Sequence, residues 1–213
     1  MINKILTLIG QKYPLTEIDC GEFAKMKISM MDFSISAYKA EGLGHISVMA
    51  AKGFFGLMKM DTLIINPTER DLPLYSYDRI FAMGNDTLIV ELYDTISGEF
   101  SDERLQAAKA EYASLTEKDP GEHWYDSIKL PSSISKKGKS ADTPKLDSLT
   151  LDHFKAYLQS TEAEGDRALK AEKSKLYVNG LIEKGGPSTD VFKKSIGEAK
   201  TRELFESILF GTK

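Results

Sequence analysis

The sequence predicts an α+β protein in which an antiparallel sheet is formed first along the chain and helices follow. Three observations carry this prediction. Residues 22–94 are rich in β-branched and aromatic residues, and apolar and polar positions partly alternate there. The connections in this half, such as Glu41–Gly44, are too short for crossover helices, so neighbouring strands must run antiparallel. After Asp94, apolar residues recur at helical spacing instead.

The length and composition fit one soluble domain that spans residues 1–213. With 213 residues, 41% of them hydrophobic, the chain can bury a full core. Its net charge of −4 implies neither a nucleic-acid nor a membrane partner. The single cysteine, Cys20, excludes a disulfide framework and a thiolate metal site, and the three histidines lack metal-ligand spacing. Because no apolar run is long enough to span a membrane and no signal peptide is evident, we expect a cytoplasmic monomer.

Strand-like runs predict a meandering sheet whose members follow one another in sequence. Turn-forming residues at Asn66–Thr68 and Gly84–Asp86 separate the last three runs. The six predicted strands are Phe23–Met30, Phe33–Lys39, Gly44–Ala51, Leu57–Ile65, Tyr75–Met83 and Thr87–Tyr93.

Helices are predicted at the start of the chain and throughout its second half. The first covers residues 1–14, and another begins after Ser101, which is a favourable N-cap. His123–Leu130 is either an extended segment or an edge strand, and the Ser-, Lys- and Gly-rich stretch Pro131–Pro144 is predicted to be a mobile loop. The remaining predictions are helices over Leu149–Glu164 and Asp166–Lys184, a stop at Gly185–Pro187, and helices over Val191–Ile196 and up to Phe210.

Two aspartates lie inside predicted strands, which is an unusual place for a charge. If the fourth and fifth strands pair across their connection, Asp61 and Asp78 could lie on one face of the sheet. Two carboxylates held close share a proton and one pKa rises, which suits a proton donor near neutral pH. A strand aspartate by itself is nevertheless more often a solvent-facing or edge residue than an acid catalyst.

The same stretch resembles the ferredoxin-dependent bilin reductases. The family has a proline-bearing loop followed by Leu-Pro, an aromatic residue and an aspartate, and the matching residues here are Asn66-Pro67 and Leu72-Pro73-Leu74-Tyr75-Ser76-Tyr77-Asp78. Asp190–Phe210 is similar to the closing helices of that family, so the resemblance extends from about Gly44 to Phe210. It implies a three-layer α/β/α sandwich with a central, mostly antiparallel sheet, in which the bilin lies between the sheet and the C-terminal helices.

The resemblance also implies roles for individual residues. Asp78 takes the position of the family's proton donor, Asp61 that of a pocket histidine, and Ser47 falls near a family glutamate. Asp78 and Asp61 are therefore the predicted catalytic pair, and Ser47, Trp124 and Arg79 are the predicted substrate-binding residues. Met49, Met58 and Met60 can line a broad flat pocket, although core filling is the commoner role of methionine.

The predicted function is reduction of a linear tetrapyrrole such as biliverdin. Electrons are expected from a separate ferredoxin or flavodoxin, because the chain has no evident redox centre and no tightly bound cofactor is expected. Since Asp61 and Ser47 replace the family's histidine and glutamate, the alternative is a non-catalytic binder of a tetrapyrrole or another planar ligand. A third alternative is a relative that acts on some other linear tetrapyrrole. The sequence has neither a phosphate-binding loop nor a nucleophile elbow, which argues against nucleotide and acyl-transfer enzymes.

Overall fold

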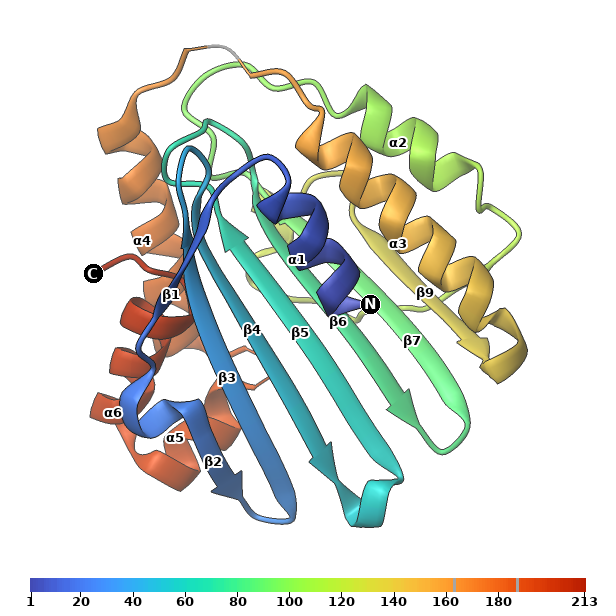
Figure 1. Cartoon of the computed structure of the whole chain (residues 1–213), viewed down its shortest axis with the longest axis vertical. Coiled ribbons are helices and arrows are strands. Elements are labelled where there is room, and N and C mark those ends of the chain that lie inside the picture. Colours follow the sequence, from blue (N-terminus) through green and yellow to red (C-terminus); the bar gives the residue numbers. More distant parts are fainter. Residues whose placement is uncertain (163, 187) are drawn as a thin grey trace.

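The computed structural model describes residues 1–162, 164–186 and 188–213 as a nine-stranded antiparallel sheet with helices on both faces (Figure 1). The strand order is β1-β3-β4-β5-β6-β7-β9-β8, and β2 pairs with the other half of the edge of β3. The three-layer α+β prediction is therefore confirmed. The strands are β1 Leu15–Ile18, β2 Lys25–Ile28, β3 Met31–Ala40, β4 Gly44–Gly53, β5 Met58–Asn66, β6 Leu74–Ala82, β7 Asn85–Tyr93, β8 Thr116–Glu117 and β9 Ile134–Lys139.

All six predicted strands are present, as β2 to β7, and β3 to β7 form the predicted meander. The prediction of a mobile loop over Pro131–Pro144 was wrong, because β9 lies there and pairs with β7. Along β9 only Ile134 and Lys136 are buried, and the Lys136 ammonium donates to the carbonyl of Leu115. A strand with so few inward apolar residues has the composition of a loop. Between His123 and Leu130 the chain forms a 3₁₀ turn and one bridge to β7 rather than a strand.

Helices α1 (Ile2–Gly10), α2 (Glu103–Ala110) and α3 (Thr143–Leu158) cover one face of the sheet (Figure 1). Helix α3 starts earlier than predicted because Pro144 stands in its first turn. Proline is tolerated there, since the backbone N–H groups of the first turn make no hydrogen bond within the helix. The helix ends at Leu158 rather than at the predicted Glu164, since residues 159–162 are not helical; residue 163 lies outside the described residues. The apolar side chains that these helices bury against the sheet include Ile5, Ile9, Leu105, Leu149, Phe154 and Tyr157.

The other face carries α4 (Arg167–Lys184), α5 (Thr189–Ile196), α6 (Glu198–Glu203) and a π-helical turn, η5 (Leu204–Leu209). The Asp166 carboxylate caps α4 by accepting from the amides of Ala168 and Leu169. Gly185 ends α4 with φ of 88°, in the left-handed region that glycine tolerates. Pro187, the last residue of the predicted stop, lies outside the described residues. In the described part of the chain, no helix combines the length and the apolar character that crossing a bilayer requires.

Three side chains of the sheet anchor the end of the chain. His45 Nε2 lies 2.7 Å from the carbonyl oxygen of Ile208, Ser47 Oγ donates to that of Leu209 at 2.7 Å, and Asn66 Nδ2 donates to that of Phe210 at 2.8 Å. Ile208 and Leu209 end the π-helical turn and Phe210 follows it, so these consecutive carbonyls would otherwise lack partners. Burial lowers the pKa of His45, so its ring is neutral, with Nε2 as the donor. The anchor fixes the end of the chain over β4 and the end of β5.

Candidate functional site

The register between β5 and β6 decides which of the predicted carboxylates can meet. It pairs Thr62 with Asp78, and Asp61 with Arg79. Directly paired residues of an antiparallel sheet point to the same face, and the next residues point to the other face. Asp61 and Asp78 therefore lie on opposite faces, and the predicted coupled pair is wrong. The physical reason is that side chains alternate along a strand with a period of two residues. A change of register by one residue therefore moves each side chain to the opposite face of the sheet.

Asp78 is the acid that remains at the site. Its side chain is half-buried and accepts a short hydrogen bond from the Thr62 hydroxyl. Burial raises the pKa of Asp78 to about 6, because it removes water from the charged form; the Thr62 hydrogen bond acts in the opposite direction, and nearby Glu91 adds to the rise. A carboxyl group with this pKa exchanges protons close to neutral pH.

Glu91 and a group of tyrosines lie beside Asp78. Glu91 is on β7, on the same face, and accepts a hydrogen bond of 2.5 Å from the Tyr93 hydroxyl. The ring centroid of Tyr93 lies 4.3 Å from that of Tyr177 and 5.5 Å from that of Tyr125. Burial raises the pKa of all three tyrosines, so they are protonated hydrogen-bond donors at neutral pH. Glu91 was not predicted from the sequence, although its alternation with Val90 and Leu92, which are buried, places it on the other face of the strand from those core residues.

An apolar surface that is half-exposed surrounds Asp78. The C-terminal layer packs over β3 and β4, so the residues of β5 to β7 nearest their Met58 and Ala82 ends retain contact with water. We call this region the Asp78 surface; it consists of the half-exposed residues Met58, Met60, Asp78, Ile80 and Ile89 around buried Thr62. Two of the three methionines singled out from the sequence are among them. A broad apolar sheet face with one perturbed acid at its centre suits a flat, largely apolar ligand that carries protonatable atoms.

The predicted substrate-binding residues lie elsewhere. Ser47 is buried and its hydroxyl is used by the carbonyl of Leu209, so its predicted role is not supported. Trp124 packs edge-on against Tyr125 and donates from Nε1 to the carbonyl of Gly185 at 2.8 Å. A Cβ at Gly180 of α4 would come within 2.2 Å of the tryptophan ring, so the ring occupies space that only a glycine leaves. Trp124 thus connects the segment before the 3₁₀ turn Asp126–Ile128 to α4.

Arg79 was expected to bind substrate, but its place in the fold does not support that role. It points to the face opposite Asp78 and is 2% exposed. Its guanidinium makes a bidentate ion pair with buried Asp86, which also accepts a hydrogen bond of 2.5 Å from the Thr143 hydroxyl. Arg79 therefore ties β6 and β7 to the start of α3.

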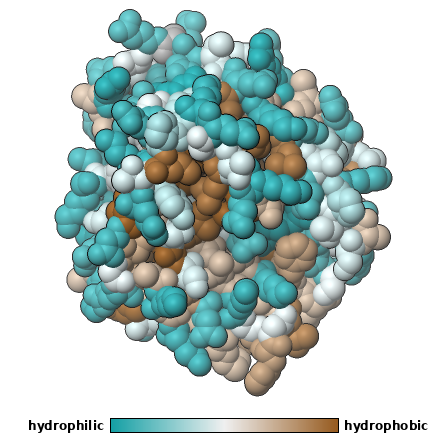
Figure 2. Space-filling model, viewed as in Figure 1, coloured by the Kyte–Doolittle hydropathy of each residue, from teal (hydrophilic) through white to brown (hydrophobic). Residues whose placement is uncertain are grey.

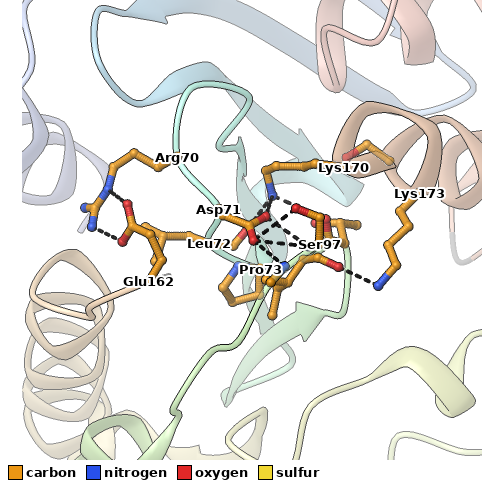
Figure 3. A network of polar contacts seen from close by, with 12 residues as sticks. Arg70, Asp71, Leu72, Pro73, Ser97, Glu162, Lys170 and Lys173 are labelled. Atoms are coloured by element: carbon orange, nitrogen blue, oxygen red, sulfur yellow. Dashed lines mark hydrogen bonds and ion pairs between the residues drawn. The ribbon is translucent and has the colours of Figure 1, made fainter. Parts of the chain in front are cut away.

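A polar cavity of about 260 Å³ lies near the loop between β5 and β6. Asp71 accepts there from the amides of Ser97 and Gly98, and Lys170 donates to the carbonyls of Leu72 and Thr95 (Figure 3). Burial lowers the pKa of Lys170 to about 8, although neighbouring Asp71 favours its charge. These polar groups already form hydrogen bonds with one another. We therefore interpret them as a structural connection between the loop and α4, and not as a ligand-binding site.

The motif that carried the family resemblance has a positioning role in this network. The carbonyl of Leu72 accepts from Lys170, that of Pro73 accepts from the Tyr157 hydroxyl at 3.0 Å, and the amide of Leu74 donates to Thr95 Oγ1 at 3.2 Å. The start of β6 is therefore held from both layers, which sets the register that places Asp78.

Within the described residues, no group of three or more His, Cys, Asp or Glu side chains is arranged to hold a metal ion. No protein-family profile matches the sequence, and no curated protein is detectably similar to it. The structure is similar to the crystal structure of phytochromobilin synthase from tomato in complex with biliverdin. The TM-score is 0.76 at 15% sequence identity, over 99% of this chain and 82% of that one. This likeness shows that the two proteins share a fold.

Proposed function

We propose that the protein binds a linear tetrapyrrole at the Asp78 surface and reduces it, with Asp78 as the proton donor. The observation that carries the proposal is the position of Asp78, a half-buried acid with a pKa of about 6 amid apolar, half-exposed side chains. A fold shared with a protein that was crystallised with biliverdin supports a tetrapyrrole over other planar ligands.

Reduction of one double bond adds two electrons and two protons to the pigment. The electrons come from a separate carrier, a ferredoxin or flavodoxin, which donates them one at a time. Asp78 is partly protonated near neutral pH because burial disfavours its charged form, and its partial exposure allows water to return the proton after each donation. The methionine and isoleucine side chains exclude water from the flat face of the pigment, which strengthens the electrostatic effect of the acid.

Spectroscopy with biliverdin tests the binding step. We expect a change in the pigment's absorption spectrum on titration with protein, and consumption of biliverdin when reduced ferredoxin is added. Absence of any spectral change at about tens of micromolar pigment, where a specific site should be filled, would contradict the proposal.

The substitution Asp78→Asn tests the chemistry, with Asp61→Asn as the matched control. The control removes a carboxylate from the adjacent strand on the opposite face. Asp78→Asn keeps the shape but cannot act as an acid, so we expect it to bind biliverdin and to turn over about 10²–10⁴-fold more slowly. Asp61→Asn should retain at least most of the activity. Equal turnover by Asp78→Asn and the parent protein would remove Asp78 from the mechanism.

A non-catalytic tetrapyrrole binder is the second candidate. Of the three pocket positions that the family resemblance suggested, only Asp78 lies at the surface, since Asp61 is on the other face and Ser47 is buried in the C-terminal anchor. For a binder we expect a spectral shift with biliverdin and no consumption with any reduced carrier.

A further inference from the structure

One end of the sheet presents large apolar side chains to water at three neighbouring hairpin turns. The turns join β2 to β3, β4 to β5 and β6 to β7, and they lie together at the lower edge of Figure 1. Hydrophobic residues gather at the same edge of the space-filling view (Figure 2). We call them the hairpin tips, with their exposed fractions: Met30 58%, Phe54 44%, Phe55 103%, Leu57 66% and Met83 87%. An exposed apolar cluster of this kind marks an interaction surface.

The backbone of these turns makes the choice of residues more unusual. Phe54, Phe55 and Met83 have φ of 51°, 56° and 50°, in the left-handed region where glycine and asparagine are favoured. Each of the three positions is thus unfavourable for a large side chain and, because it is exposed, unfavourable for an apolar one. Folding does not explain why these residues are there.

The charges behind the tips are positive, in contrast to the whole chain. The overall net charge is −4. In the segments that lead to this end of the sheet (residues 25–34, 50–61, 79–87 and 136–139), the exposed charged residues are six lysines and one aspartate: Lys25, Lys27, Lys52, Lys59, Lys137, Lys139 and Asp32. Lys52 and Lys59 are direct partners across β4 and β5, and the acid Asp86 is buried and neutralised by Arg79. The protein is therefore negatively charged as a whole but positively charged at this end of the sheet.

We propose that the hairpin tips dock the protein on an anionic lipid bilayer surface. Strands lie about 4.8 Å apart, so neighbouring tips are spaced by about 10 Å and can enter one bilayer together. Lys52 and Lys59 lie two residues behind Phe54 and Leu57, which places their backbone about 7 Å from the tips. Interfacial side chains enter a bilayer by about 5–10 Å, so the lysines lie at the level of the lipid phosphates.

A lipid surface fits this end better than a protein partner does. A specific protein interface buries about 800 Å² on each partner in a closely packed patch. The tips are instead spread over three neighbouring hairpin turns about 10 Å apart, and fluid lipid can surround each of them without matching their shape. The absence of an overall basic charge argued against a membrane partner, but headgroup binding depends on charges within a Debye length of the surface.

Flotation with lipid vesicles tests the proposal. The full chain should float with vesicles of phosphatidylcholine mixed with phosphatidylglycerol, bind phosphatidylcholine alone much more weakly, and detach as salt is raised. The double variant Phe55→Ser with Leu57→Ser should lower the partition coefficient at least about tenfold. Lys52→Gln and Lys59→Gln should each lower it about fivefold.

The matched control is Leu176→Ser with Val191→Ser, which removes two exposed apolar side chains (62% and 48% exposed) from α4 and α5, far from the tips in sequence. It should float like the parent protein. No flotation of the parent protein, or an equal loss in the control, would overturn the proposal. Concentration-dependent dimerisation without vesicles that Phe55→Ser with Leu57→Ser abolishes would identify a second copy of the chain as the occupant and would also overturn it. All three outcomes are independent of bilin binding.

Discussion

The two faces of the sheet differ in how completely their side chains are covered. On the face toward α1, α2 and α3, the side chains of β5 to β7 near the middle of the sheet are sealed, among them Leu63, Tyr77 and Val90. On the opposite face the C-terminal layer covers β3 and β4, and the residues around Asp78 stay half-exposed. A single step along β6, from Asp78 to Arg79, crosses from one environment to the other.

The comparison shows how coverage decides what a charged residue can do. Sealed Arg79 needs a partner that neutralises it fully, and buried Asp86 provides one. Asp78 has a hydroxyl partner in place of a cation, and its pKa rises instead. We therefore expect the Arg79 pair to matter for stability, and Asp78 to matter for proton transfer.

The largest effect on stability is expected from Arg79→Met. It leaves the Asp86 carboxylate buried without its cation, so we expect the free energy of unfolding to fall by about 3–5 kcal/mol. Urea unfolding at neutral pH measures it. The matched control is Arg202→Met, which breaks a half-exposed pair with Glu206 and should lower stability by about 1 kcal/mol or less. Similar losses in both variants would show that the two faces do not differ as described.

A smaller effect is expected from the pKa of Asp78. Because its folded-state pKa of about 6 lies above the ordinary value of 3.8, its contribution to stability is complete below pH 3.8 and is lost as the pH rises through 6. Asp78→Asn removes this loss. Relative to the parent protein, the variant should gain about 1–2 kcal/mol between pH 4 and pH 7, after allowance for the partial exposure of the group. A constant stability difference across this range would contradict the raised pKa.

Ser47→Ala separates the C-terminal anchor from a role in binding. Loss of the hydrogen bond to the Leu209 carbonyl should lower stability by about 1 kcal/mol, without changing the affinity for biliverdin. Ser34→Ala, at an exposed serine of β3, is the control and should change neither. Weakened pigment binding at unchanged stability would instead support the substrate-binding role that the sequence suggested.

The smallest expected effect concerns the hydroxyl beside Asp78. The Thr62 hydrogen bond lowers the pKa of Asp78, so Thr62→Val should raise it by a fraction of a unit. The pH at which turnover declines on the alkaline side should then move upward. Thr87→Val, on β7 of the same face, should leave the profile in place. A downward shift for Thr62→Val would show that the hydroxyl does not stabilise the carboxylate.

Local patterns in the sequence were sufficient for the main elements. The strands β2 to β7 alternate and are bounded by turn-forming residues, and the Asp166 cap and the Gly185 stop of α4 depend only on nearby backbone. β1, β8 and β9 were missed because each is short or buries few apolar side chains, so its stability comes from the strands it pairs with.

The α+β order of elements, the central meander and the candidate role of Asp78 follow from the local sequence alone. Which residues join Asp78 depends on how distant segments pack: Thr62 and Glu91 lie beside it, whereas Asp61 and Arg79 face away and Ser47 anchors the chain end. The reason is that a strand repeats every two residues, so a sequence spacing fits either face until the register is fixed. Here contacts from distant parts of the chain fix it, through Lys170 and Tyr157 on the residues just before β6.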